Sequence, residues 1–233
     1  MNDPQPAQDH TDDVEYAQQR FSPPEGSTQL LLVRHGASAA ARPGTIFPLV
    51  DGQGDPPLAP EGHDQARLVG ARLASEPIDA LYVTTLQRTH QTAAPLIEAT
   101  GLEPRVEPDL REVYLGEWEG GRYREHVANG HPIAREMFEK QRWDVIPGAE
   151  PDDDFRNRVV AGIERIRDNH PGERVVAVVH GGVIAAAVGH ATGVNGWMFA
   201  GAENCSIHHL VLIDGVWMLR AFNDVAHLGP LLR

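Results

Sequence analysis

The sequence predicts a three-layer α/β fold, in which a mostly parallel central sheet carries helices on both faces. The segments 29–33 and 174–179 each consist of one polar residue followed by an uninterrupted apolar run, which is typical of strands covered on both sides. Segments with helical spacing alternate with such runs along the chain, as in doubly covered sheets. Ligands of these sheets bind beyond the carboxyl ends of the strands. That edge draws attention here because "LLLVRHG" and "VVAVVHGG" both end in a histidine followed by a glycine.

The first half of the chain combines a polar tail with alternating strands and helices. Residues 1–28 are rich in proline, aspartate and glutamine, and we interpret them as a disordered acidic tail. Residues 29–233 are expected to form a single domain. Its first elements are predicted as a strand at 29–33, a long loop at 36–60, a helix at 60–76 that begins at Pro60 and is stopped by Pro77, a strand at 78–84, a helix at 86–100 ended by Gly101, and a short strand at 103–108.

The second half continues the pattern after a polar interruption. Residues 122–147 are polar with scattered aromatic side chains, and we expect a helical insertion over the sheet. Asp214 and Gly215 indicate a two-residue turn between two strands. The other expected elements are a helix at 152–170, a strand at 174–179, a helix at 181–193, and strands at 205–213 and 216–222.

Composition excludes several classes of protein. The formal net charge of −13 argues against binding to nucleic acid or to anionic membranes, which requires broad basic surfaces. The chain has no apolar run long enough for a membrane span, and its start lacks the features of a signal peptide. Cys205 is the one cysteine, so no internal disulfide or cysteine-rich zinc site can form. We expect a cytoplasmic protein, and the sequence is compatible with a homodimer.

Residues suited to phosphoryl transfer follow the predicted strands. Arg34 and His35 end the first strand, His180 ends a later one, and Arg88 lies in the first turn of the helix after the second. Arginines can grip phosphoryl oxygens, one imidazole can attack phosphorus, and another can stabilise the charge that develops. An acidic residue from loop 109–120, which we call the acid loop, could protonate the leaving group. Each residue alone has an ordinary alternative, such as a surface arginine or a structural histidine. This chemistry requires no metal and no cofactor.

Seven segments sharpen this interpretation by their order and spacing. They are "LLVRHGAS", "PLAPEGHDQA", "TLQRTHQTA", "LREVYLGEWEG", "PGAEPDDDFRNRV", "VVHGGVI" and "FNDVAHL". Together they resemble the motif blocks of the histidine phosphatase superfamily, the family of cofactor-dependent phosphoglycerate mutases and related phosphatases. The resemblance covers about residues 29–228 and implies a phosphoglycerate mutase-like fold.

The resemblance also implies a role for each matching residue. It implies that His35 is the nucleophile that becomes phosphohistidine and that Glu112 is the proton donor. The other implied residues contact the phosphoryl group or border its pocket: Arg34, Arg88 and His180 form the phosphate pocket, Gly181 donates a backbone N–H, and Ser38 lies at the pocket edge.

This chain departs from the family pattern in two places. Many members carry asparagine seven positions after the motif arginine, where this chain has Ala41, and the neighbouring Arg42 is a candidate to supply the missing contact. The classical mutases have a long insertion between the acid loop and the second histidine, which is absent here because only 68 positions separate Glu112 from His180. This spacing resembles the shorter phosphatase branch.

Three functions remain open from the sequence. The first is a metal-independent phosphatase acting on a small phosphorylated metabolite, the second is a phosphoglycerate mutase-type phosphoryl transfer, and the third is a non-catalytic module that binds a phosphorylated ligand. The intact set of candidate residues favours the phosphatase. Specificity is expected to reside in residues 39–57 and 122–147, and Glu150 could line the entrance or simply favour the start of a helix.

Overall fold

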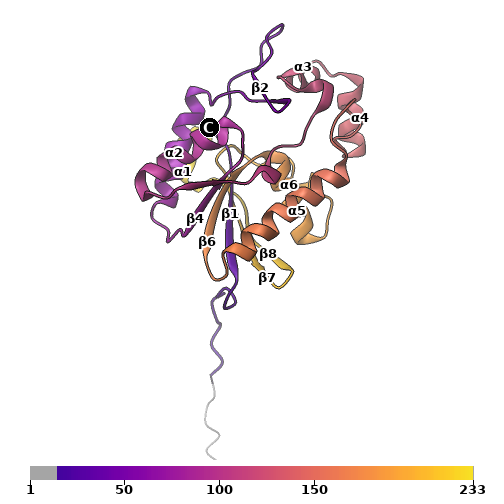
Figure 1. Cartoon of the computed structure of the whole chain (residues 1–233). Helices are drawn as coiled ribbons and strands as arrows, with labels where there is room; N and C mark the ends of the chain where they lie inside the picture. Colours follow the sequence, from indigo (N-terminus) through magenta and orange to yellow (C-terminus); the bar gives the residue numbers. More distant parts are fainter. Residues whose placement is uncertain (1–14, 233) are drawn as a thin grey trace, which may run out of the picture.

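The computed structural model describes residues 15–232 and has a six-stranded sheet at its centre (Figure 1). Its strands are β1 Thr28–Arg34, β4 Ala80–Val83, β5 Pro104–Val106, β6 Arg174–Val179, β7 Ile207–Ile213 and β8 Val216–Asp224. They lie in the order β5-β4-β6-β1-β7-β8. The first four are parallel, and β7 and β8 are antiparallel to their neighbours. The predicted mostly parallel sheet is therefore confirmed.

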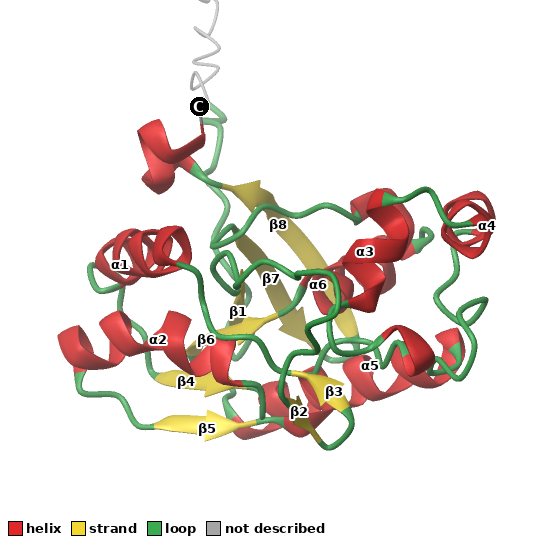
Figure 2. Ribbon diagram, turned by 90° about the horizontal axis from the view of Figure 1, so that it is seen from above, coloured by secondary structure: helices red, strands yellow, loops and turns green. Residues whose placement is uncertain are grey.

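Helices cover both faces of this sheet, which completes the predicted three layers (Figure 2). One face carries α1 Pro60–Leu73 and α2 Gln87–Thr100, and the other carries α5 Asp152–Asn169 and α6 Gly181–Thr192. Successive side chains of a strand point to opposite faces, so Leu31 and Val33 pack toward α1 and α2, while Leu30 and Leu32 pack toward α5 and α6. No helix within residues 15–232 is long and apolar enough to cross a membrane.

The start of the sheet differs slightly from the prediction. Strand β1 begins at Thr28, one residue before the expected boundary, because its side chain is buried and its hydroxyl donates to the carbonyl of His170 at 2.8 Å. Residues 15–26 contain no helix or strand and are mainly exposed. Residues 1–14 of the predicted acidic tail lie outside the described residues. At the other end of the chain, Asp214 and Gly215 form the predicted turn between β7 and β8.

The long loop predicted at 36–60 contains a small hairpin. Strands β2 Leu49–Val50 and β3 Gln53–Gly54 pair antiparallel across Asp51 and Gly52, which both have positive φ. An aspartate-glycine pair is a strong signal for such a turn, and it stands in the sequence here as it does at residues 214–215. We name residues 39–57 the lip, because this segment borders the carboxyl edge of the sheet.

Residues 122–147 contain two short helices, α3 Arg122–Ala128 and α4 Pro132–Lys140. They pack around a separate apolar cluster of Trp118, Ala134, Met137 and Ile146. Figure 1 shows the lip and these helices at the same end of the molecule. The remaining helical turns are η1 Pro108–Leu110, η2 Gly116–Trp118, η3 Gly196–Phe199 and η4 Ala226–Leu232.

Candidate active site

Parallel pairing of β1 with β6 brings the two predicted histidines together. Arg34 lies opposite Val179 in the register, so His35 and His180 follow adjacent strand ends. The backbone N–H of His35 donates to the carbonyl of Val179 at 3.0 Å. The two imidazole rings have centroids 5.2 Å apart, and both side chains are buried. The sequence alone could not establish this adjacency, which the sheet register now provides.

His35 is held as a neutral imidazole with one defined tautomer. Its Nδ1 lies 2.8 Å from the carbonyl of Gly36, which can only accept, so Nδ1 carries the proton. Its Nε2 accepts from Arg88 Nε at 3.3 Å and therefore bears the lone pair. Burial and then the charges of Arg88 and Arg34 hold the pKa of His35 well below its usual value of 6.5. Nε2 is thus prepared to act as a nucleophile.

A close backbone approach fixes the turn that follows His35. A Cβ atom on Gly36 would lie 2.5 Å from the carbonyl oxygen of Gly62 in α1, and a Cβ on Gly62 would lie 2.0 Å from the carbonyl oxygen of Ala37. The backbone N–H of Gly36 also donates to the hydroxyl of Thr92 in α2 at 3.0 Å. Glycine is needed here because α1 packs directly against the chain that follows His35.

His180 is fully buried beside His35 and has one free ring nitrogen. Its Nε2 lies 3.0 Å from the hydroxyl of Thr84, which follows β4. Its Nδ1 has no hydrogen-bond partner among the described residues. Burial, followed by the Arg88 cation, lowers the pKa of His180 well below 6.5. A bound phosphoryl dianion would oppose both effects, because an opposite charge favours the protonated imidazole.

Arg34 and Arg88 place two guanidinium groups beside His35. Arg88 is 7% exposed and lies 3.8 Å from the carboxylate of Asp55, measured from Nη1 to Oδ1. Burial lowers the pKa of both arginines, and the Glu112 carboxylate partly reverses this effect. Both remain cationic because an arginine pKa starts so high. The Nε atom of Arg34 is buried and has no partner within residues 15–232.

Glu112 reaches the same region from the loop after η1. Its carboxylate accepts from the backbone N–H of Val113 at 3.0 Å and from that of Gly182 at 3.2 Å. A Cβ on Gly182 would lie 2.4 Å from Oε1 of Glu112, so a larger residue in the first turn of α6 would displace the Glu112 carboxylate. Gly181, the first residue of α6, lies beside Arg34, because a Cβ on it would be 3.5 Å from Arg34 Nε.

An arginine that sequence reasoning missed borders the cavity. Arg124 of α3 donates from Nη2 to the hydroxyl of Ser38 at 2.7 Å, and both residues line the cavity. Arg124 is exposed as a whole, but desolvation of its guanidinium at the cavity, followed by repulsion from Arg34, lowers its pKa. Arg42, which was expected to replace the asparagine missing at Ala41, is exposed and does not line the cavity. The structure therefore does not support that expectation. The sequence offered only one signal for Arg124, namely that it is a basic residue within the insertion predicted at 122–147.

Hydrogen bonds join the lip to the acid loop. Gln53 donates from Nε2 to the carbonyl of Glu112 at 2.7 Å, and the backbone N–H of Gly54 donates to Oε2 of Glu119 at 2.7 Å. The other oxygen of Glu119 accepts from the backbone N–H of Leu115 at 2.8 Å. Glu119 is therefore a structural carboxylate, and the two loops form one continuous wall.

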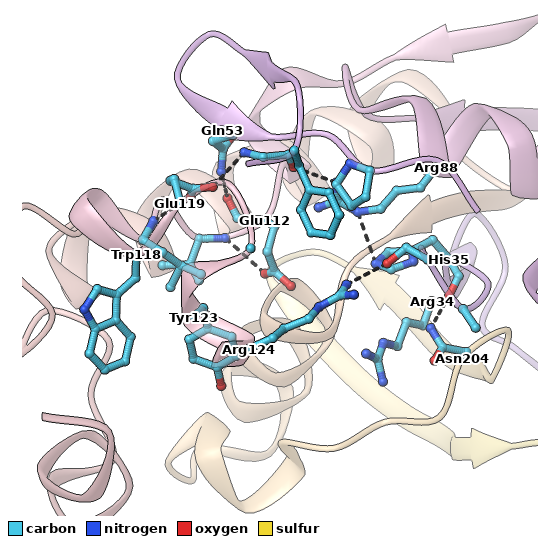
Figure 3. Close-up of a pocket in the computed structure, with 18 of the residues that line it drawn as sticks. Arg34, His35, Gln53, Arg88, Glu112, Trp118, Glu119, Tyr123, Arg124 and Asn204 are labelled. Atoms are coloured by element: carbon cyan, nitrogen blue, oxygen red, sulfur yellow. Dashed lines mark hydrogen bonds between the residues drawn. The ribbon is translucent and has the colours of Figure 1, made fainter. Parts of the chain in front are cut away.

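The cavity between these segments has a volume of about 360 Å³ (Figure 3). Figure 3 shows Arg124 extending from α3 toward the side that holds His35. The cavity lining also includes four aromatic side chains, Phe47, Trp118, Tyr123 and Trp143, and Figure 3 shows Trp118 and Tyr123 on the side away from His35. Burial raises the pKa of Tyr123 to about 12, so its hydroxyl stays protonated and can donate a hydrogen bond. Neither His180 nor Gly181 belongs to the cavity lining among the described residues.

Comparison with known proteins places this geometry in a family. A family model described as "Histidine phosphatase superfamily (branch 1)" matches residues 30–225. The Arabidopsis thaliana protein "Phosphoglycerate mutase-like protein 4" is 33% identical, with 94% of this chain and 90% of that protein covered. The "Metal-independent phosphoserine phosphatase" of the same plant is also 33% identical, with 87% and 84% covered.

Solved structures show the same arrangement of elements. The phosphoglycerate mutase of Bacillus anthracis superimposes with a TM-score of 0.73 at 22% identity, covering 90% of this chain and 98% of that one, which is a likeness of fold. The mycobacterial glucosyl-3-phosphoglycerate phosphatase in complex with inorganic phosphate gives a TM-score of 0.71 at 26% identity, with 85% and 98% covered. The expected phosphoglycerate mutase-like fold is confirmed.

Proposed function

The chain belongs to the histidine phosphatase superfamily, and on this premise we propose that it is a metal-independent phosphatase that hydrolyses a small phosphomonoester through a phosphohistidine at His35. The observation that carries the proposal is the state of the His35 ring. Its Nδ1 proton is held by the Gly36 carbonyl, and its Nε2 lone pair faces the Arg88 guanidinium. A neutral buried imidazole beside two cations is suited to attack a phosphoryl group that those cations hold.

The reaction has two steps. In the first, Nε2 of His35 bonds to phosphorus while the bond from phosphorus to the substrate oxygen breaks, and Glu112 gives its proton to that oxygen. Arg34, Arg88, His180 and the backbone N–H of Gly181 stabilise the negative charge on the transferred group. In the second, Glu112 takes a proton from water, the water oxygen bonds to phosphorus, and the bond to Nε2 breaks. Inorganic phosphate is released, and Glu112 is again protonated.

Hydrolysis is favoured over mutase chemistry because water can reach the proton donor. Glu112 is only half-buried, and Arg124 above it is exposed. A mutase must instead keep water away from its phosphoenzyme and return the phosphoryl group to a second hydroxyl. Mutase chemistry remains the second candidate, because relatives described as phosphoglycerate mutases match along most of this chain.

The third arginine suggests which phosphomonoesters fit. A phosphoryl dianion can offset the charges of Arg34 and Arg88, which leaves the Arg124 guanidinium for the alcohol part of the substrate. A second anionic group on that part would supply a charge-assisted hydrogen bond. Phosphoserine and phosphoglycerate, which appear in the names of two relatives, both carry a carboxylate. We therefore propose a substrate with a carboxylate or a second phosphate near the ester.

The test is phosphate release from p-nitrophenyl phosphate and from a panel of phosphometabolites in the presence of a chelator. The wild-type protein should turn over, and His35→Ala should abolish release because no phosphohistidine can form. Intact-mass measurement after rapid quenching should show one added phosphoryl group on the wild type and none on the variant. Turnover that survives His35→Ala would rule out the mechanism, and 2- to 3-phosphoglycerate interconversion with little free phosphate would favour the mutase.

A further inference from the structure

Arg158, in the middle of α5, uses every N–H of its guanidinium to hold the acid loop. Nε donates to Oε1 of Glu150 at 2.6 Å, and Nη2 donates to Oε2 of the same carboxylate at 2.9 Å. The other three N–H groups donate to backbone carbonyls of Asp109 and Arg111, both at 2.7 Å, and of Glu112 at 2.9 Å. Five donors therefore meet five acceptors, and three of those acceptors belong to the loop that carries the proton donor.

Glu150 extends this hold to the far side of Glu112. Its carboxylate accepts from the backbone N–H of Tyr114 at 3.2 Å, and its own N–H donates to the carbonyl of Tyr114 at 2.9 Å. The pair is mostly buried, with 21% of the Arg158 side chain and 15% of the Glu150 side chain exposed. Arg158 and Glu150 thus fix the backbone both before and after Glu112.

The position of that backbone decides where the carboxyl group of Glu112 can lie. The carboxylate has two hydrogen bonds, one to its neighbour Val113 and one to Gly182 of α6. The Glu112 carboxylate occupies the space in which a side chain of residue 182 would lie, since a Cβ on Gly182 would be 2.4 Å from Oε1. A shift of the loop would therefore either break the contact with α6 or turn the carboxyl group away from the cavity.

We propose that Arg158 and Glu150 are positioning residues, which hold the backbone of Glu112 so that its carboxyl group can protonate the leaving oxygen. This inference rests on the proposed function, because it assumes that Glu112 is the proton donor. Neither Arg158 nor Glu150 lines the main cavity, so neither touches the reacting atoms. The planar fork of arginine is essential, because the single ammonium of lysine cannot reach a carboxylate and three carbonyls at once.

The experiment compares two substrates of similar shape that differ in their need for an acid. The p-nitrophenolate anion leaves without a proton, whereas the alkoxide of benzyl phosphate requires one. Values of kcat/KM are measured for both substrates, since this quantity reports the step in which the leaving group departs. Glu112→Gln supplies the reference pattern for a lost acid, and Arg158→Lys keeps the charge while removing the fork.

Arg158→Lys should reproduce the Glu112→Gln pattern in weaker form. We expect kcat/KM for benzyl phosphate to fall on the order of 100-fold, the cost of misplacing a catalytic group by about 1 Å. The value for p-nitrophenyl phosphate should change by less than about 3-fold, because that leaving group needs no proton. Glu150→Gln, which retains the size of the side chain, should give a smaller loss with the same preference for the benzyl ester.

Arg165 on the same helix provides a matched control. It pairs with Glu107 and Asp109 near the start of the loop but makes no bond to residues 110–114. Arg165→Lys should leave the ratio of the two kcat/KM values unchanged. Equal losses on both substrates in Arg158→Lys and Glu150→Gln, or no loss at all, would overturn the positioning role. A wild type inactive on both esters would instead count against the proposed function itself.

Discussion

The two halves of the cavity are built in different ways. The phosphoryl half is lined by Arg34, His35 and Arg88, and His180 is buried next to His35. These residues come from two adjacent strand ends and from the first turn of a helix packed on the same sheet. The outer half consists of the lip, the acid loop and α3, which are far apart in the sequence and meet only above the sheet.

The arginine that we assign to the outer half is more exposed than the charged and titratable side chains of the phosphoryl half. His35, Arg88 and His180 are each less than 8% exposed, whereas Arg124 of the outer half is exposed. Charges interact more strongly where water is excluded, so the phosphoryl half can supply most of the stabilisation of the reacting group. The outer half can vary without disturbing the sheet, which suits it to select the alcohol part of the substrate.

The strongest test of this division is Arg88→Met. Losing a buried cation that contacts His35 should lower kcat/KM by about 100- to 1000-fold, the effect of removing one preorganised group that stabilises transition-state charge. The loss should be the same for every phosphomonoester, because the phosphoryl group is common to all of them. Steady-state kinetics on three unrelated esters would check this, and a loss confined to one ester would contradict the division.

The outer half should instead discriminate between substrates. Phosphoserine and phosphoethanolamine differ by a single carboxylate, so they isolate the contact that we assign to Arg124. Arg124→Met should lower kcat/KM for phosphoserine roughly 10- to 100-fold, the worth of one hydrogen bond to a charged group. Phosphoethanolamine should be nearly unaffected.

Arg42→Met is the matched control for that measurement. Arg42 belongs to the lip, which Arg124 contacts at the carbonyl of Ala39, but Arg42 is exposed and does not line the cavity. Its replacement should change neither value by more than about 2-fold, as for most exposed surface charges. A larger effect of Arg42→Met than of Arg124→Met on phosphoserine would show that the lip, rather than α3, recognises the alcohol part.

The same division explains what the sequence could predict. The strands predicted at residues 29–33 and 174–179 contain continuous apolar runs from residues 30 and 175 onward. Side chains at their carboxyl ends must meet if the strands are neighbours. Arg34, His35 and His180 could therefore be proposed as a cluster from local patterns. The geometry places these residues together at one edge of the sheet.

The outer half lacked such a signal, because its contacts join loops whose relative position no local pattern encodes. Arg124 stands in a polar segment without periodicity, and Arg42 was preferred only because it is next to Ala41 in the sequence. Glu119 accepts from two backbone N–H groups, of Gly54 and Leu115, and no local pattern in loop 109–120 distinguishes it from the other acids of that loop. The Asp51–Gly52 pair is a local signal for the hairpin in the lip, but such a signal does not reveal which other segments the hairpin contacts.

Buried neutral histidines should make the phosphoryl half sensitive to acid. His208 on β7 lies beneath this half, where its Nε2 lies 2.8 Å from the hydroxyl of Ser206, and the carbonyl of Ser206 accepts from the backbone N–H of Arg34. Burial lowers the pKa of His208 to about 4. In the unfolded chain its pKa returns to about 6.5, so below that pH the unfolded state binds a proton that the folded state does not.

Stability should therefore be lost as the pH falls from about 6.5 toward 4. Between pH 7 and pH 5, His208 should account for about 2 kcal/mol of the decrease in the free energy of unfolding. His35 and His180 are shifted in the same direction and add to the loss. The free energy of unfolding, measured with urea at both pH values, should decrease by about 2 kcal/mol less in His208→Gln than in the wild type. His63 is exposed, so His63→Gln is the control for the loss of a histidine and should behave like the wild type. An equal decrease in the free energy of unfolding for the wild type and His208→Gln would mean that His208 is protonated in the folded protein at about pH 5. A buried positive charge would then lie next to the phosphoryl half.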